Sequence, residues 1–142
     1  MNLVQFLHWA RKKGGGSYNL NTGRFNPSTG YMVAVNCEKQ LSVLSKELVK
    51  IYLAEYSEQL TADDAFFGLW LADGVWYYDV SKNVSRLSDA IRLGMQHDQL
   101  AIWDCENGVS IELPKRQTAG TLTQQKAYID SVVERIEKGR KV

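Results

Sequence analysis

The chain has 142 residues, of which 44% are hydrophobic and 23% are charged, a composition typical of globular rather than disordered proteins. Its 17 basic and 16 acidic residues give a formal net charge of +1, which excludes a broadly basic nucleic-acid binder and leaves only local patches to consider. We therefore expect no DNA partner. The length predicts a single domain over residues 1–142, which needs neither a disulfide nor a metal ion to fold.

The two cysteines, Cys37 and Cys105, are far apart in the sequence and form no CxxC pair. They are typical of free thiols in a reducing cytoplasm. The N-terminus places its basic residues after its apolar ones, which is the reverse of a secretory signal, and no apolar run is long enough to span a bilayer. We expect a cytoplasmic protein without a membrane partner.

The first half of the chain predicts a helix, two strands and a second helix. Apolar residues recur at a helical spacing within 1–13, and Gly14-Gly15-Gly16 follows as a flexible joint. The runs 17–20 and 31–35 are typical of strands and are separated by turn residues. Residues 38–60 predict a long amphipathic helix, with one apolar face formed by Leu41, Leu44, Leu48, Ile51 and Tyr52.

The second half predicts two hairpins and two more helices. Asp73-Gly74 lies between two apolar runs and favours a type I′ turn, as does Asn107-Gly108 between the runs 100–104 and 109–113. Ser85 is a candidate N-cap for a third helix, and Thr121 with Gln124 fits a capping box for a helix over 121–139. The predicted buried faces of these helices are Leu87, Ala90, Ile91 and Met95, and Ile129, Val132, Val133 and Ile136.

The predicted elements therefore follow the order α, ββ, α, ββ, α, ββ, α. Hairpins that alternate with helices indicate an α+β fold, in which an antiparallel sheet is built from hairpins and helices pack against it. The expected parts of the domain are the N-terminal helix (1–13), a core (15–113) and the C-terminal helix (121–139).

The sequence contains no recognisable catalytic or metal-binding motif. A nucleophilic pair of Cys105 and His97 is conceivable because both flank the last hairpin, but no orienting third group stands at a recognisable spacing. The other histidine, His8, fits a half-exposed helix position. HExxH, calcium-loop and P-loop patterns are missing from the sequence. We expect no enzyme, no cofactor and no metal ion, and an enzyme built on Cys105 is the last of our hypotheses.

Aromatic and basic residues in predicted loops are the remaining chemical signal. Aromatic rings stack on nucleobases, and Arg24, Lys115 and Arg116 could donate charge-assisted hydrogen bonds to phosphates. For any single one of these residues, a structural role is the simpler interpretation. The aromatic residues in or beside loops are Tyr18, Phe25, Tyr31, Trp76 and Trp103.

The order of the motifs resembles that of small domains encoded by phages and other mobile elements. The segment "NTGRFNPSTGYMVAV" is followed by a helix, by "FFGLWLADGVWYYDVSKNV" and by a helix that runs into "QHDQLAIWDCENG". In such relatives the last segment reads like N-Q-x-A-I-W/Y-D, and Asp98 stands here in the place of the Asn. Within residues 15–113 the chain is similar to the phage anti-Thoeris sponge proteins, which sequester cyclic ADP-ribose-type signals of bacterial immunity.

The resemblance implies a non-catalytic, homo-oligomeric protein that binds a cyclic nucleotide in the cytoplasm of a bacterial host. It predicts Phe25 and Trp103 as stacking residues and Arg24 and Arg116 as phosphate ligands. Asp98 and Gln99 are the candidates for contacts with a ribose or a base edge. The alternative is a protein–protein inhibitor or interaction module of a mobile element without a nucleotide ligand, which would use the N-terminal helix, a sheet edge or an aromatic patch such as Trp76-Tyr77.

Overall fold

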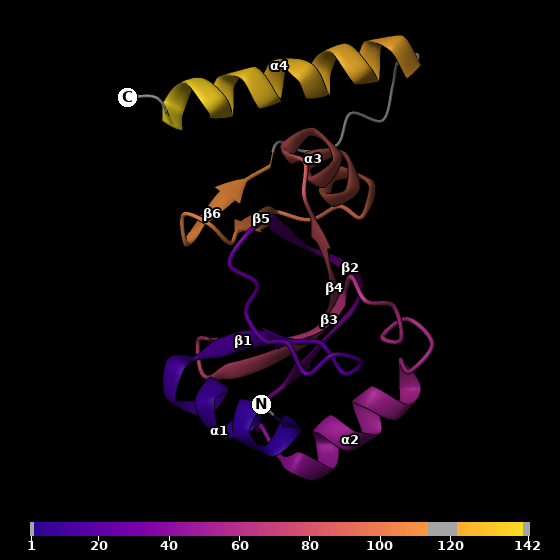
Figure 1. Ribbon diagram of the computed structural model, residues 1–142, viewed down its shortest axis with the longest axis vertical. Coiled ribbons are helices and arrows are strands. Elements are labelled where there is room, and N and C mark those ends of the chain that lie inside the picture. The colour runs from indigo at the N-terminus through magenta and orange to yellow at the C-terminus, as the bar shows by residue number, and fades with distance from the viewer. Residues whose placement is uncertain (1, 114–121, 141–142) are drawn as a thin grey trace.

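The computed structural model of the chain describes residues 2–113 and 122–140. In this part of the chain it shows an α+β fold, with the helices and strands in the predicted order (Figure 1). The elements are α1 (Leu3–Lys13), β1 (Gly15–Tyr18), β2 (Tyr31–Leu41), α2 (Lys46–Glu55), β3 (Ala65–Ala72), β4 (Val75–Val84), α3 (Leu87–Gln96), β5 (Ala101–Asp104), β6 (Val109–Glu112) and α4 (Leu122–Arg140).

The six strands form one antiparallel, curled sheet in the order β1-β3-β4-β2-β5-β6. The hairpins β3–β4 and β5–β6 are confirmed, but the first pair of strands is not a hairpin. β1 pairs with β3, whereas β2 lies between β4 and β5. The segment between β1 and β2, residues 19–30, must therefore pass across the sheet, and we call it the strap.

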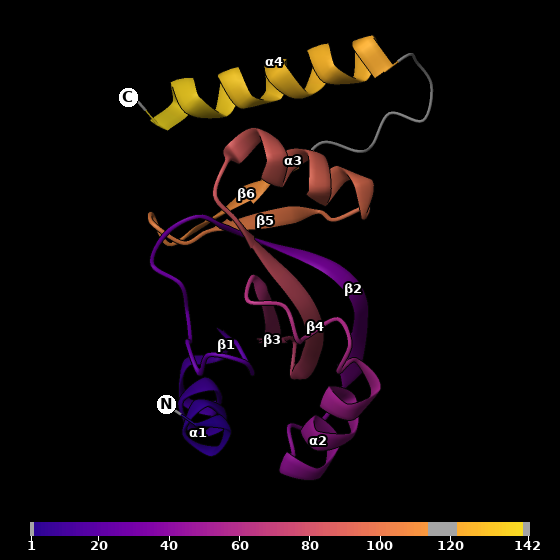
Figure 2. The same cartoon turned by 45° about the vertical axis from the view of Figure 1, so that its right-hand side comes forward.

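Helices α1, α2 and α3 pack on one face of the sheet, and α4 packs on the outer side of α3 (Figure 2). Because side chains alternate along a strand, the register places Phe67, Tyr78 and Val33 on the same face. Phe67 and Tyr78 belong to a core cluster with α1 and α2, and Val33 belongs to a second cluster with α3 and α4. The opposite face is concave, and the strap runs along its open side (Figure 2).

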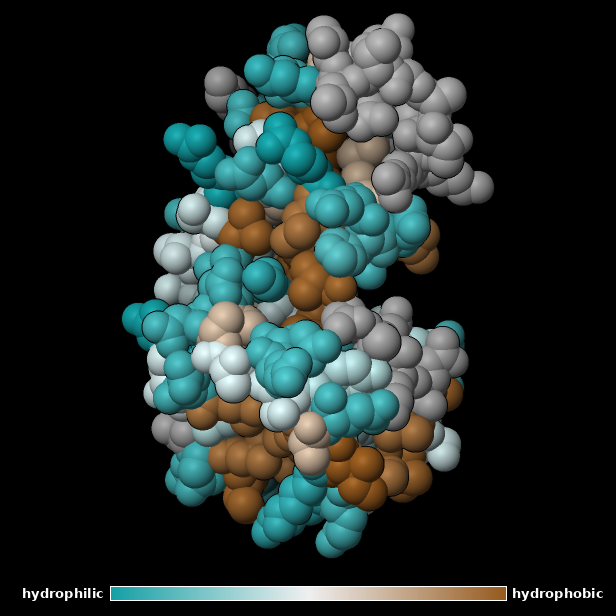
Figure 3. All heavy atoms as spheres, turned by 90° about the vertical axis from the view of Figure 1, so that its right-hand side faces the viewer, coloured by the Kyte–Doolittle hydropathy of each residue, from teal (hydrophilic) through white to brown (hydrophobic). Residues whose placement is uncertain are grey.

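The second helix is shorter than its sequence pattern predicts. It begins at Lys46, where the hydroxyl of Ser45 accepts a hydrogen bond from the Leu48 amide at 3.1 Å, and it ends at Glu55. Residues 38–41 belong instead to β2, because their pairing with β4 overrides the helical apolar repeat. The buried positions of α2 are Val49 and Tyr52. Ile51 is 62% exposed. In the half of the molecule that contains α2, apolar side chains reach the surface (Figure 3).

The three glycines after α1 form no flexible joint. Gly14 ends the helix with φ +84°, and its carbonyl accepts a hydrogen bond from the Leu71 amide at 2.9 Å. Gly15 and Gly16 belong to β1 and lie opposite Trp70 and Leu69. A side chain at Gly15 would place its Cβ 2.5 Å from the Leu69 carbonyl oxygen, so the close approach of β1 to β3 requires glycine there.

The turn predictions were correct for one hairpin and wrong for the other. Asp73 and Gly74 both have positive φ, at +53° and +76°, as a type I′ turn requires. In the last hairpin only Gly108 has a positive φ, and residues 105–108 form a longer loop. The Asp104 carboxylate organises this loop by accepting hydrogen bonds from the Glu106 amide, the Asn107 amide and the Asn107 side chain.

Two cap predictions have different outcomes. The N-cap of α3 is Arg86 rather than Ser85, and its side chain makes no capping hydrogen bond. The capping box of Thr121 and Gln124 lies outside the described residues.

The predicted buried faces of α3 and α4 are confirmed, with Val133 and Ile136 partly buried beside the fully packed positions. Among the described residues, no helix is both long and apolar enough to cross a membrane.

The missing side chain of Gly68 on the concave face provides a test of the packing between β3 and β4. Gly68 lies opposite Asp79, and a Cβ at Gly68 would collide with the Asp79 carboxylate, whose Oδ1 accepts the Ser81 hydroxyl at 2.8 Å. Overpacking of this kind costs about 1–3 kcal/mol. We expect Gly68→Ala to lower the free energy of unfolding by that amount in urea titration. The loss should shrink in an Asp79→Ala background, and an equal loss in both backgrounds would contradict the assigned collision.

Candidate functional site

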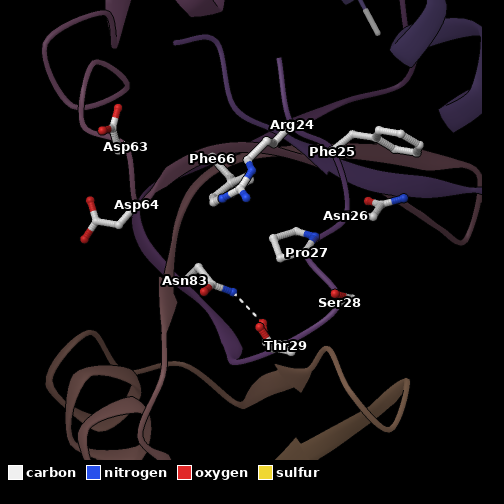
Figure 4. A pocket seen from close by; sticks show the side chains of 10 residues that line it. All are labelled: Arg24, Phe25, Asn26, Pro27, Ser28, Thr29, Asp63, Asp64, Phe66 and Asn83. Carbon is white, nitrogen blue, oxygen red and sulfur yellow. Dashed lines mark hydrogen bonds between the residues drawn. The ribbon is translucent and has the colours of Figure 1, made fainter. Parts of the chain in front are cut away.

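A pocket of about 550 Å³ lies where the strap meets the end of the β3–β4 ladder. The strap supplies one wall, the segment that enters β3 supplies the other, and Phe66 and Asn83 extend from the concave face of the sheet (Figure 4). Its ten lining residues are Arg24, Phe25, Asn26, Pro27, Ser28, Thr29, Asp63, Asp64, Phe66 and Asn83.

Asn19 anchors the start of the strap. Its side chain is fully buried, and its amide nitrogen donates to the carbonyls of Asp63 at 2.8 Å and Ala65 at 3.0 Å. Its side-chain oxygen accepts from the amides of Asn21 and Thr22. One amide thus satisfies four backbone groups and joins the two walls of the pocket, which a smaller apolar side chain could not do.

Two further asparagines hold the rest of the strap. The side-chain oxygen of Asn26 accepts the Ser17 amide of β1 at 2.9 Å. The side-chain nitrogen of Asn83 donates to the Thr29 carbonyl at 3.0 Å and lies 3.4 Å from the Met32 sulfur and 3.8 Å from the Cys105 sulfur. The strap is therefore fixed to both β1 and β4 by amide groups, and the pocket is formed before any ligand arrives.

The charged side chains around the pocket differ in whether they have a partner. The Asp63 carboxylate accepts the Asn21 side chain at 2.8 Å, and Asp64 lies 4.0 Å from the Lys82 ammonium. Both carboxylates point away from the centre of the pocket in Figure 4. The Arg24 side chain extends inward beside Phe66, and its guanidinium forms no ion pair with any described residue (Figure 4). Arg24 is the one cationic residue among the ten that line the pocket.

The structure brings only part of the predicted site together. Arg24 and Phe25 both line the pocket, but the Phe25 ring points outward and meets Trp9 edge to face, with centroids 5.7 Å apart (Figure 4). Trp103 shares the concave face with Asn83, because Met32 on β2 lies between the two in register. Two strand spacings, about 10 Å, separate Trp103 from Asn83.

The other three predicted residues do not line this pocket or lie outside the described chain. Asp98 is exposed, with φ +53°, in the turn that follows α3. The Gln99 side chain donates to the His97 carbonyl at 3.2 Å in the same turn. Arg116 falls outside the described residues.

Sequence reasoning missed eight of the ten lining residues: Asn26, Pro27, Ser28 and Thr29 of the strap, and Asp63, Asp64, Phe66 and Asn83. Asp63 and Asp64 read as ordinary residues at the end of a helix, and Phe66 reads as one more apolar residue of a buried strand. Asn83 carried no signal by itself, because its role depends on the strap that returns over it. The one available clue was the density of turn residues in the strap, which predicts an ordered loop but not what lies beneath it.

The thiol of Cys105 is poorly suited to nucleophilic attack. Burial raises its pKa, and the neighbouring Asp104 carboxylate raises it further, against a smaller lowering by the Met32 backbone. His97 ends α3 and is exposed. A protonated thiol is a weak nucleophile, so these surroundings oppose the chemistry that a Cys105–His97 pair would need.

No known protein family, curated protein or solved structure matches the chain.

The environment of Cys105 predicts slow alkylation. In a Cys37→Ser background, the rate of reaction with iodoacetamide should rise with pH through a midpoint above that of free cysteine, because the raised pKa keeps the thiol protonated. Asp104→Asn should lower this midpoint, whereas Glu106→Gln, a matched loss of one acidic charge in the same loop, should leave it in place. A midpoint below that of free cysteine would contradict the assignment.

Proposed function

We propose that the chain is a non-catalytic binding protein that holds a small anionic ligand in the strap pocket and so sequesters a nucleotide messenger. The guanidinium of Arg24 carries this proposal, because it extends into the pocket and forms no ion pair with any described residue. The volume of about 550 Å³ falls within the range of about 300–1,000 Å³ that is common for small-molecule sites.

The lining residues suit a phosphorylated ligand with hydroxyl or amide groups. A guanidinium binds phosphate oxygens through two parallel N–H donors, and it does so most strongly where no competing carboxylate neutralises it. Around Arg24, the hydroxyls of Ser28 and Thr29 can donate or accept, and the Phe66 ring supplies an apolar surface. The similarity of the motif order to that of the anti-Thoeris sponges favours a ligand of the cyclic ADP-ribose type.

The surroundings of the pocket support binding rather than turnover. The Asn83 amide lies between the pocket and Cys105, whose thiol has a raised pKa. The side chains that hold the strap are amides, which neither gain nor lose protons in the physiological range. A pocket fixed by such groups is suited to retaining a ligand unchanged.

A second candidate function is an interaction module that uses the β5–β6 hairpin. Three apolar residues of this region are strongly exposed: Leu100 at 84%, Val109 at 48% and Trp103 at 46%. β6 is also the last strand of the sheet, and edge strands can pair with another chain. The aromatic patch expected at Trp76-Tyr77 is not available, because Trp76 is buried in the first core cluster.

Titration calorimetry with cyclic ADP-ribose isomers tests the proposed function. We expect binding that Arg24→Gln weakens about 10- to 100-fold, since a hydrogen bond to a charged group contributes about 1.5–3 kcal/mol. Arg86→Gln removes an exposed arginine from the N-cap of α3 and should have no effect. Heating the complex should release intact ligand.

Three results would count against this function. Recovery of a cleaved product would make the protein an enzyme. Equal binding by the Arg24→Gln and wild-type proteins would place the ligand outside the strap pocket. The absence of binding across the isomers would favour the interaction module.

A further inference from the structure

We infer that a second surface, where the end of α1 meets the β3–β4 hairpin, binds a single strand of nucleic acid. Trp70 and Tyr77 lie opposite each other on β3 and β4, and their rings stack with centroids 4.1 Å apart and planes 13° from parallel. Trp70 is nevertheless 42% exposed. The pair therefore offers an ordered aromatic surface to which a flat ring can add.

Basic residues lie at the same edge of the sheet as this aromatic pair, on helix α1, which packs against the opposite face. The last turn of α1 carries Arg11, Lys12 and Lys13, all exposed. Gly14 then accepts the Leu71 amide at 2.9 Å, and Gly15 is the register partner of Trp70. Lys13 is thus only two residues from the partner of Trp70, and a strand that contacts both the ring and the helix end passes around the edge strand β1.

The lysines at this end of α1 are free to meet an anion. Arg11 donates to the Leu44 carbonyl at 3.2 Å, but Lys12 and Lys13 form no ion pair with any described residue. The Asp73 carboxylate in the hairpin turn is the acidic group closest to Trp70 along the chain. Asp79 shares the face of Trp70 and Tyr77, but it is buried and its carboxylate accepts the Ser81 hydroxyl. The exposed charges of the described residues at this edge are therefore mainly positive, although the balanced charge of the whole chain predicts no DNA partner.

Trp103 shows why charge decides between two exposed tryptophans. It is 46% exposed, similar to Trp70, but Asp104 follows it in the chain, Glu106 lies in the next loop, and Glu112 is the partner of Ala101 on the same face. A polyanion with flat rings is attracted to the lysine-flanked Trp70 and repelled from the acidic surroundings of Trp103. Single strands expose their bases for stacking, whereas a duplex keeps them paired inside, so the occupant is a single strand.

Fluorescence polarisation with labelled ten-nucleotide oligo-dT and oligo-U tests the inference. We expect both to bind at low salt with similar affinity, because stacking tolerates differences of base and sugar. Trp70→Ala should weaken binding about tenfold or more, and the matched variant Trp103→Ala should not. Lys12→Gln with Lys13→Gln should also weaken it, and these neutral side chains at two exposed positions place no acidic charge against the C-terminal end of the α1 dipole.

The salt dependence of the binding constant is an independent test of the inference. Contacts with two or three phosphates predict that log K falls with log salt with a slope of roughly −1.5 to −2. Equal binding by the Trp70→Ala and Trp103→Ala proteins would overturn the inference, as would a duplex that binds as tightly as the single strand. A mononucleotide that competes as well as the ten-nucleotide strand would do the same. Arg24→Gln should leave this binding unchanged, which separates the two surfaces.

Discussion

The pairing of β1 with β3 is the constraint on which the site depends. Four register pairs, from Gly15 opposite Trp70 to Tyr18 opposite Phe67, commit the first strand to the edge of the sheet. The next strand, β2, lies beyond β3 and β4 in the strand order, so the chain between them must cross the sheet. The convex face is already occupied by helices, and the crossing therefore takes the concave side. The pocket is the space left beneath this crossing.

A crossing loop must satisfy its own backbone groups, and this requirement shapes the walls of the pocket. The chain solves it with amides: Asn19 is fully buried with four hydrogen bonds, while Asn26 and Asn83 tie the middle and the end of the strap. Amides offer donors and acceptors without charge, so they fix the loop without neutralising a nearby ion. The guanidinium of Arg24 forms no ion pair with any described residue, and the proposed anion binding rests on this group.

Local sequence patterns predicted the helices and strands. They failed where pairing between residues far apart in the sequence determines the structure. Asp73-Gly74 forms the predicted turn because both flanking strands are neighbours in sequence and need only that turn. The prediction of a helix over 38–60 was wrong at its start because Leu41 pairs with Trp76. A pattern read over a short stretch of sequence cannot include both residues. The residues of the candidate site divide in the same way, into those predicted locally and those that depend on distant segments. Arg24 was predicted from its own chemistry, but Asn83 becomes part of a pocket only when a segment more than 50 residues earlier returns over it.

The alternation of side chains along β3 and β4 separates the two aromatic roles in this protein. Tyr78 and Trp76 face the helices and are buried in the core, whereas Trp70 and Tyr77 face the other way and keep an open ring surface. On the concave face, Trp70 and Tyr77 stack on each other, whereas Phe66 is buried beside the strap. The concave face is thus where the chain exposes two large rings, Trp70 and Trp103, without removing an aromatic ring from its core.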